Sequence, residues 1–163
     1  MKKDIIDMVY KKYYRDVYLY IYSLCKNHHE TEILVSDTFF KAILSLEGCE
    51  VHLKYWLLRV GKNLWQDSLK KKPQLSIEDD YIDQGKGPLE QLILNETQRT
   101  VYESIVGLSN PYKEILIHYY FNGFSLKEIA EMKKVSPGAA RTLLYRARIK
   151  LMAELQEEEI DGF

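Results

Sequence analysis

The sequence predicts an all-α protein made of two small helical domains joined by a flexible linker. Apolar residues recur at helical spacing on both sides of residues 73–88, and no stretch shows a convincing β-strand pattern. Between them, Pro73, Pro88, two glycines and a run of acidic residues interrupt all periodicity. We therefore expect domains at 1–72 and 89–163, with the linker at 73–88.

The composition is that of a folded protein, because 46% of the 163 residues are hydrophobic and 29% are charged. No run approaches the roughly 18 consecutive apolar residues of a membrane span, and the charged N-terminus is unlike a signal peptide. Cys25 and Cys49 lack metal-ligand spacing and are too few for a disulfide framework. We interpret them as buried or inert thiols of a cytoplasmic protein.

Three helices are expected in the first domain. The apolar residues that mark them are Ile5, Val9, Tyr13, Val17, Tyr20, Ile21 and Leu24, then Ile33, Leu34, Phe40, Ile43 and Leu44, then Leu53, Leu57, Val60, Leu64 and Ser68. On the third helix a polar arc of about 100° contains Arg59, Lys62, Asn63, Gln66 and Lys70, with Tyr55 and Trp56 near its start. Such a face suits unwinding or single-stranded nucleic acid, although Trp56 and Trp65 fit a core position better than a stacking one.

The second domain is expected to hold helices near 89–106, 111–121, 126–133 and 137–155. Ser125 and Glu128 form a capping-box pattern, with Phe124 and Ile129 as a hydrophobic staple. The next helix begins with Ser136 as N-cap and Pro137 at its first position. The three residues 133–135 between these helices have the length of a helix-turn-helix connection, although Lys134 stands where glycine is frequent.

Positive charge is concentrated on the last helix. Residues 136–152 contain four basic and no acidic residues, whereas the whole chain has a net charge of −1. Its apolar residues share an arc of about 120°: Ala140, Leu143, Leu144, Ala147, Leu151 and Leu155. The opposite side carries Arg141, Thr142, Tyr145 and Arg146. Arginine reads guanine edges or clamps phosphates, so this face predicts recognition of the DNA major groove.

Enzymatic interpretations have little support. The histidines at 28, 29, 52 and 118 lack metal-ligand spacing, and the sequence contains no phosphate-binding glycine loop or nucleophile elbow. We predict no enzyme activity, no cofactor and no metal. The main alternative to the function that follows is a stand-alone dimeric helix-turn-helix regulator. A protein-binding adaptor would leave both basic faces unexplained.

Three segments, HETEILVSDTFFKAIL, KYWLLRVGKNLWQDSLKKK and LSNPYKEILIHYYFNGFSLKEIAEMKKVSPGAARTLLYRARIKL, carry a family resemblance in their order and spacing. The chain resembles a bacterial extracytoplasmic-function (ECF) sigma factor of the sigma-70 family, which keeps only sigma regions 2 and 4. The resemblance implies a factor that binds core RNA polymerase and directs promoter-specific transcription initiation. It departs from the family pattern at Ile33, where an acid is usual, and at Ser36, where Gln is usual.

The resemblance assigns roles to three sets of residues. The interface with the polymerase clamp helices would contain Leu34, Asp37, Thr38, Phe39 and Lys41. The minus-ten element would contact Trp56, Arg59, Lys62, Asn63 and Gln66, with Asn63 holding a flipped base and the loop at 47–53 forming the wall of its pocket. The minus-thirty-five element would contact Ser136, Gly138, Arg141, Thr142, Tyr145 and Arg146. The implied partners are the clamp and the beta flap of polymerase, promoter DNA and an anti-sigma factor.

Overall fold

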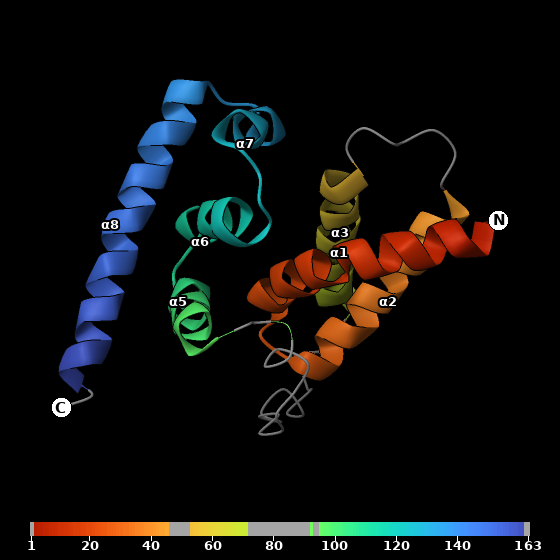
Figure 1. The fold of residues 1–163 in the computed structure, drawn as a ribbon, viewed down its shortest axis with the longest axis horizontal. Helices are drawn as coiled ribbons and strands as arrows, with labels where there is room; N and C mark the ends of the chain where they lie inside the picture. The colour runs from red at the N-terminus through yellow and green to blue at the C-terminus, as the bar shows by residue number, and fades with distance from the viewer. Residues whose placement is uncertain (1, 46–52, 72–91, 93–94, 162–163) are drawn as a thin grey trace. The chain divides into compact units, whose positions relative to one another are not determined.

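The fold is all-helical in a computed structural model that describes residues 2–45, 53–71, 92 and 95–161. The chain divides into two compact units, Met1–Leu92 and Ile93–Phe163. Figure 1 shows α1, α2 and α3 in the first unit and α5 to α8 in the second. The predicted linker at 73–88 and the loop at 47–53, apart from Leu53, lie outside the described residues.

The first unit is built from three long helices that all pack on one another. They are α1 (Lys2–Cys25), α2 (His28–Leu44) and α3 (Leu53–Lys71). Gly61 on α3 allows a close approach to the other two helices, because a methyl group there would stand 2.7 Å from Ile21 Cδ1 and 3.2 Å from Thr38 Oγ1. A larger residue would push α3 away from both α1 and α2.

Aromatic rings line the seam between α1 and α2. Tyr10, Tyr14 and Tyr18 follow one another at four-residue spacing, with ring centroids 5.0 and 5.9 Å apart, and Tyr10 meets Phe39 of α2 edge-on. At the far end, the Tyr18 hydroxyl lies 2.6 Å from His28 Nδ1. Burial raises the pKa of Tyr18, so this hydroxyl stays protonated and can donate to an unprotonated Nδ1.

The second unit contains several short helices and one long one. The short helices are α5 (Glu96–Val106), α6 (Tyr112–Leu116) with its π-helical continuation η2 (Ile117–Phe121), and α7 (Leu126–Lys133). The long helix α8 (Pro137–Asp161) packs against α5, α6 and α7. The core of the unit includes Tyr102, Ile115 and Leu116 from the short helices and Leu144 from α8.

The observed helices agree with the sequence-based expectations at most of their ends. The helix expected at 126–133 is found at those residues, and α8 begins at Pro137 as expected but continues six residues beyond 155. The helix expected near 89–106 is described only from Glu96, where Asn95 accepts a hydrogen bond from the Gln98 N–H at 2.7 Å. The helix expected at 111–121 changes to π geometry for its last five residues.

Candidate nucleic-acid interface

Local capping defines the angle between α7 and α8. Ser125 and Glu128 cap each other's backbone N–H groups, at 3.1 and 3.0 Å, which confirms the capping box. At the other end of α7, Lys134 adopts a left-handed conformation with φ of 56°, and the Val135 N–H donates to the Ala130 carbonyl at 3.0 Å. This is the hydrogen bonding of a Schellman turn, with lysine in the place where glycine is favoured.

The N-terminal turn of α8 begins at Ser136, as the sequence predicts. The Ser136 hydroxyl accepts a hydrogen bond from the Ala139 N–H at 3.1 Å. Gly138 lies in the first turn, where backbone N–H groups have no partner within the helix and favour an anion. A methyl group on Gly138 would meet only the Ser136 hydroxyl, at 4.0 Å, so this glycine faces open space.

The two sides of α8 separate as the sequence pattern indicates. Ala140, Leu144, Ala147 and Leu151 are buried, whereas Leu143 and Leu155 are half-buried. The residues assigned to the minus-thirty-five element are all exposed: Ser136, Gly138, Arg141, Thr142, Tyr145 and Arg146. These residues therefore present two guanidinium groups, three hydroxyls and the N-terminus of the helix to solvent.

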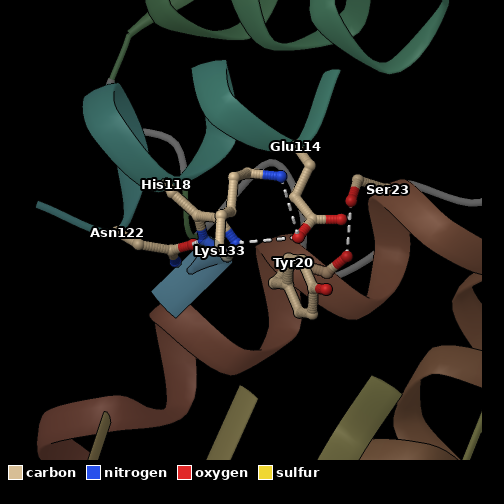
Figure 2. A network of polar contacts seen from close by, with 6 residues as sticks. All are labelled: Tyr20, Ser23, Glu114, His118, Asn122 and Lys133. Carbon is tan, nitrogen blue, oxygen red and sulfur yellow. Dashed lines mark hydrogen bonds and ion pairs between the residues drawn. The ribbon is translucent and has the colours of Figure 1, made fainter. Parts of the chain in front are cut away.

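A polar network lies behind the helix-turn-helix, within the second unit. Figure 2 shows the Glu114 carboxylate between His118 Nε2 and Lys133 Nζ, both at 3.5 Å from the same oxygen. His118 Nδ1 lies 3.1 Å from the Asn122 side-chain oxygen, and both residues are buried. Because Lys133 is the last residue of α7, this network ties that helix to α6 and η2. The Ser23 and Tyr20 pair drawn in the same figure is a separate hydrogen bond within α1.

Two cations attach α8 to the short helices, and the sequence analysis did not single out either of them. Arg148 Nε donates to the Tyr120 hydroxyl at 2.7 Å, and its guanidinium lies over the rings of Tyr119 and Tyr120. The hydrogen bond raises the pKa of Arg148, which therefore stays charged. Lys150 lies 4.9 Å from the ring centre of Tyr112. Both contacts join residues about 30 or more apart, so no local pattern reveals them.

The polar arc of α3 is accessible in the first unit. Arg59, Asn63 and Gln66 are exposed, whereas Lys62 and Trp56 are half-buried. At 100° per residue, Trp56 stands only about 20° from Asn63 around the helix, so its ring borders the arc. Trp65 is also half-buried and stands about 160° from Asn63, on the other side of the helix.

The exposed face of α2 contains only two of the five residues that the family resemblance assigns to the polymerase interface. Leu34, Thr38 and Phe39 are buried against α1 and α3, so their side chains are not accessible to a partner. Asp37 and Lys41 are exposed. Beside them, Ile33, Phe40 and Leu44 form an apolar stripe whose side chains are 50–70% exposed. Because α2 is apolar on several sides, helical spacing alone did not decide which side packs.

The described residues contain neither a metal-binding cluster nor a membrane-spanning helix. In residues 2–45, 53–71 and 95–161, no group of three or more His, Cys, Asp and Glu side chains is placed to hold a metal ion. Within the same part of the chain, no helix is long and apolar enough to cross a membrane.

Two family models match the chain, each over one of the two units. The model described as Sigma-70 region 2 matches residues 9–73, and the one described as Sigma-70, region 4 matches residues 98–151. Among curated proteins, the ECF RNA polymerase sigma factor SigM of Bacillus subtilis is 31% identical over 155 residues, covering 91% of this chain and 93% of SigM.

Solved structures share the fold at lower sequence identity. The structure of CnrH in complex with the cytosolic domain of CnrY has a TM-score of 0.67 at 19% identity, and covers 95% of this chain and 90% of CnrH. The sigma factor RpoE of Bartonella quintana, bound to the anti-sigma factor NepR, has a TM-score of 0.66 at 22% identity, with coverages of 94% and 98%.

Proposed function

This chain belongs to the ECF sigma factors of the sigma-70 family, which bind core RNA polymerase and direct promoter-specific transcription initiation, and we propose how its residues divide that work. The domain at 1–72 docks on the polymerase clamp and reads the minus-ten element. The domain at 89–163 reads the minus-thirty-five element and contacts the beta flap, and residues 73–88 connect the two. Family membership also argues against the alternative of a stand-alone dimeric helix-turn-helix regulator.

We propose that the clamp docks on the exposed face of α2. Asp37 and Lys41 offer charges of both signs, and the apolar stripe of Ile33, Phe40 and Leu44 supplies surface that water solvates poorly. An apolar centre with a charged rim is the usual composition of a protein–protein interface. In this proposal the stripe contacts the clamp. Leu34, Thr38 and Phe39 are buried, so they hold α2 in position and do not touch polymerase.

The minus-thirty-five element is assigned to the exposed side of α8. Arg141 and Arg146 have the reach and the donors for guanine edges, while Ser136 and Gly138 stand at the helix N-terminus, where a phosphate is favoured. Each domain alone should bind duplex DNA weakly, because phosphate neutralisation supplies most of its affinity. Holding both domains on one polymerase raises the effective concentration of the second contact.

The observation that carries the minus-ten assignment is the exposed amide of Asn63 on the same side of α3 as the half-buried Trp56, two helical turns away. An amide offers both a donor and an acceptor, which is what reading the edge of an extruded base requires. Arg59, Lys62 and Gln66 share the arc and would hold the displaced strand by its phosphates. We propose that this face opens the promoter and reads one flipped base.

Promoter opening by core polymerase that carries the Asn63→Ala variant tests this assignment. We expect roughly tenfold or more loss of permanganate-reactive open complex, the equivalent of about 1–3 kcal/mol of base reading. Binding to core enzyme should not change, and a pre-melted template should recover only part of the loss. Gln156→Ala, an exposed amide in the other unit, is the matched control. Normal opening by Asn63→Ala would show that this residue is ordinary surface.

We also propose that the protein acts in the cytoplasm, where polymerase works, and that an anti-sigma factor binds it. RpoE of Bartonella quintana is bound to an anti-sigma factor, and CnrH is bound to the cytosolic domain of another protein. The exposed stripe on α2 is the surface such a factor would cover if it competes with polymerase. An anti-sigma factor that is captured with this chain should compete with core enzyme for binding to it. Phe40→Glu should weaken the binding of that factor.

A further inference from the structure

Lys134 has an unfavourable backbone conformation at the turn between α7 and α8. Its φ and ψ are 56° and 45°, a left-handed conformation that glycine adopts freely and that asparagine tolerates. The hydrogen bonds of the turn do not require a lysine side chain, because the Lys134 and Val135 N–H groups both donate to backbone carbonyls of α7. The presence of lysine at this position is therefore not explained by the turn itself.

The two adjacent lysines at this turn have different surroundings. The side chain of Lys133 is 20% exposed, and its ammonium lies 3.5 Å from the Glu114 carboxylate in the polar network behind the helices. Lys134 is exposed. Within residues 2–45, 53–71 and 95–161, no carboxylate lies close enough to Lys134 to form an ion pair with it. The charge of Lys134 is thus accessible to a partner outside the chain.

The groups that follow Lys134 along the chain are also positive. Ser136, two residues later and at most about 7 Å away, is the N-cap of α8, whose first backbone N–H groups carry partial positive charge. Arg141 follows on the exposed side of α8, and it forms no ion pair with any residue that the structure describes. A cation beside a helix N-terminus is unfavourable, and a bound anion removes the repulsion. These charges therefore favour an anion at the start of α8.

The place of Lys134 between the two helices indicates which anion fits. When a helix-turn-helix binds DNA, its second helix enters the major groove and its first helix crosses the sugar–phosphate backbone. The turn that joins α7 to α8 would then lie at the edge of the groove, where phosphates are found. A lysine ammonium on its flexible stem binds phosphate as a point charge and reads no base sequence.

We propose that Lys134 binds a backbone phosphate beside the minus-thirty-five element, near the N-terminus of α8. This inference rests on the proposed assignment of α8 to that element and adds a contact to it. The contact helps to position α8 on the duplex and does not distinguish one sequence from another. Residues in sparsely populated backbone conformations are concentrated at functional sites. Here the lysine lowers the stability of the free protein and strengthens its complex with DNA.

Equilibrium binding of holoenzyme, made from core polymerase and the full chain, to promoter DNA tests the contact. The probe is a duplex that this holoenzyme selects from a random pool, and affinity is measured between roughly 0.05 and 0.5 M salt. Lys134→Asn removes the charge and keeps a residue that tolerates the left-handed conformation. We expect about fivefold to tenfold weaker binding at 0.1 M salt, and a slope of log affinity against log salt that is smaller by about one. Lys134→Arg, which keeps the charge, should restore both.

Neutral methylphosphonate links, placed one at a time in the selected duplex, show whether the contact is direct. One such link should weaken binding of the wild-type chain about as much as Lys134→Asn does, and should have no further effect on that variant. Lys26→Asn is the matched control, because Lys26 is an exposed lysine of the first unit with the same φ of 56°. This control should bind like the wild type and should keep the full effect of the link.

Wild-type affinity and salt slope for Lys134→Asn would overturn the proposal, as would an equal loss for Lys26→Asn or a loss that Lys134→Arg does not restore. Arg141→Ala distinguishes this failure from a failure of the proposed function. If Arg141→Ala weakens binding and Lys134→Asn does not, α8 reads the element and only the lysine contact is wrong. If neither variant changes binding, and base changes in the upstream element have no effect either, the assignment of α8 to DNA is wrong as well.

Discussion

The two units hold their exposed faces in different ways. In the first, three long helices interlock through their side chains, and the close approach at Gly61 sets the position of α3 and its polar arc. In the second, caps and turns fix short helices against one long helix, and a partly buried polar network joins α6, η2 and α7. The first unit thus depends on contacts distant in sequence, whereas the helix-turn-helix depends mainly on neighbours.

This difference predicts separate responses to mutation. A change at a helix crossing should destabilise the first unit strongly, and a change at a cap should cost the second unit a modest amount. The two tryptophans of the chain, Trp56 and Trp65, both lie in the first unit. Tryptophan fluorescence therefore follows the unfolding of that unit, while circular dichroism follows the helices of both.

The largest effect is expected for Gly61→Val. Its Cβ alone would stand 2.7 Å from Ile21 Cδ1, which is closer than real contacts, and 3.2 Å from Thr38 Oγ1, which is tighter than most, and both neighbours are fully buried. We expect the first unit to lose about 1–3 kcal/mol of unfolding free energy, as overpacked cores do. Urea unfolding monitored by tryptophan fluorescence measures it. Gly138→Val, the same change at a glycine in open space, should leave that transition where it is; equal shifts for the two variants would contradict the packing argument.

Removal of the capping box should have a smaller effect, confined to the second unit. Ser125→Ala deletes the hydroxyl that accepts the Glu128 N–H at 3.1 Å. We expect a loss of about 1 kcal/mol in the part of the circular dichroism transition that tryptophan fluorescence does not follow. Ser125→Asp retains an acceptor and should keep most of the stability. A matching shift in the fluorescence transition would mean that the two units unfold together.

Lys134→Gly should stabilise the same unit. Lys134 has a φ of 56°. This left-handed conformation is unfavourable for most residues that have a Cβ atom, and it has no such penalty for glycine. Glycine also gives the unfolded chain more conformational freedom, which offsets part of the benefit. We therefore expect a net gain of about 0.5–1 kcal/mol in the free energy of unfolding. Lys127→Gly, inside α7 at an exposed position, should instead lose about that amount. Thermal unfolding of the two variants should therefore shift in opposite directions.

The smallest effect concerns the turn between α1 and α2. Here the first unit, like the second, has a helix N-cap and a left-handed residue. Asn27 caps α2, Lys26 is left-handed, and the Cys25 thiol lies 3.0 Å from the Thr31 hydroxyl. Burial raises the pKa of Cys25, so little thiolate exists at neutral pH. In a Cys49→Ser background, iodoacetamide should react slowly at pH 7, and about tenfold faster per pH unit up to the raised pKa. Fast alkylation at pH 7 would show that the turn opens.

Sequence reasoning succeeded where neighbours decide the structure and failed where distant residues do. Short local patterns predict where α7 and α8 begin, namely Ser125 with Glu128 and Ser136 with Pro137. Both helices begin there in the structure. The two faces of α8 could be predicted too, because its charges and apolar residues occupy different sides. On α2 apolar residues occur all round the helix, so only the packing against α1 and α3 determines that Phe39 is buried and Phe40 is exposed.

The same reason accounts for the contacts that no pattern predicted. The Arg148 pair with Tyr120 and the network around Glu114 join residues on different helices, and each partner alone is an ordinary polar or aromatic residue. The roles of Asn63, Arg141 and Arg146 remain predictions, because they concern DNA and the structure concerns the protein.

The π-helical turn η2 has a consequence for the length of the chain. The Asn122 N–H donates to the Ile117 carbonyl, five residues back, at 2.9 Å, so this turn accommodates one more residue than an α-helical turn would. Elsewhere in a helix, losing one residue rotates everything that follows by about 100°. Within η2, such a loss can be absorbed by tightening the turn, so that α6 and α7 keep their facing. Related chains that are one residue shorter between Glu114 and Ser125 should therefore retain the same helix-turn-helix geometry.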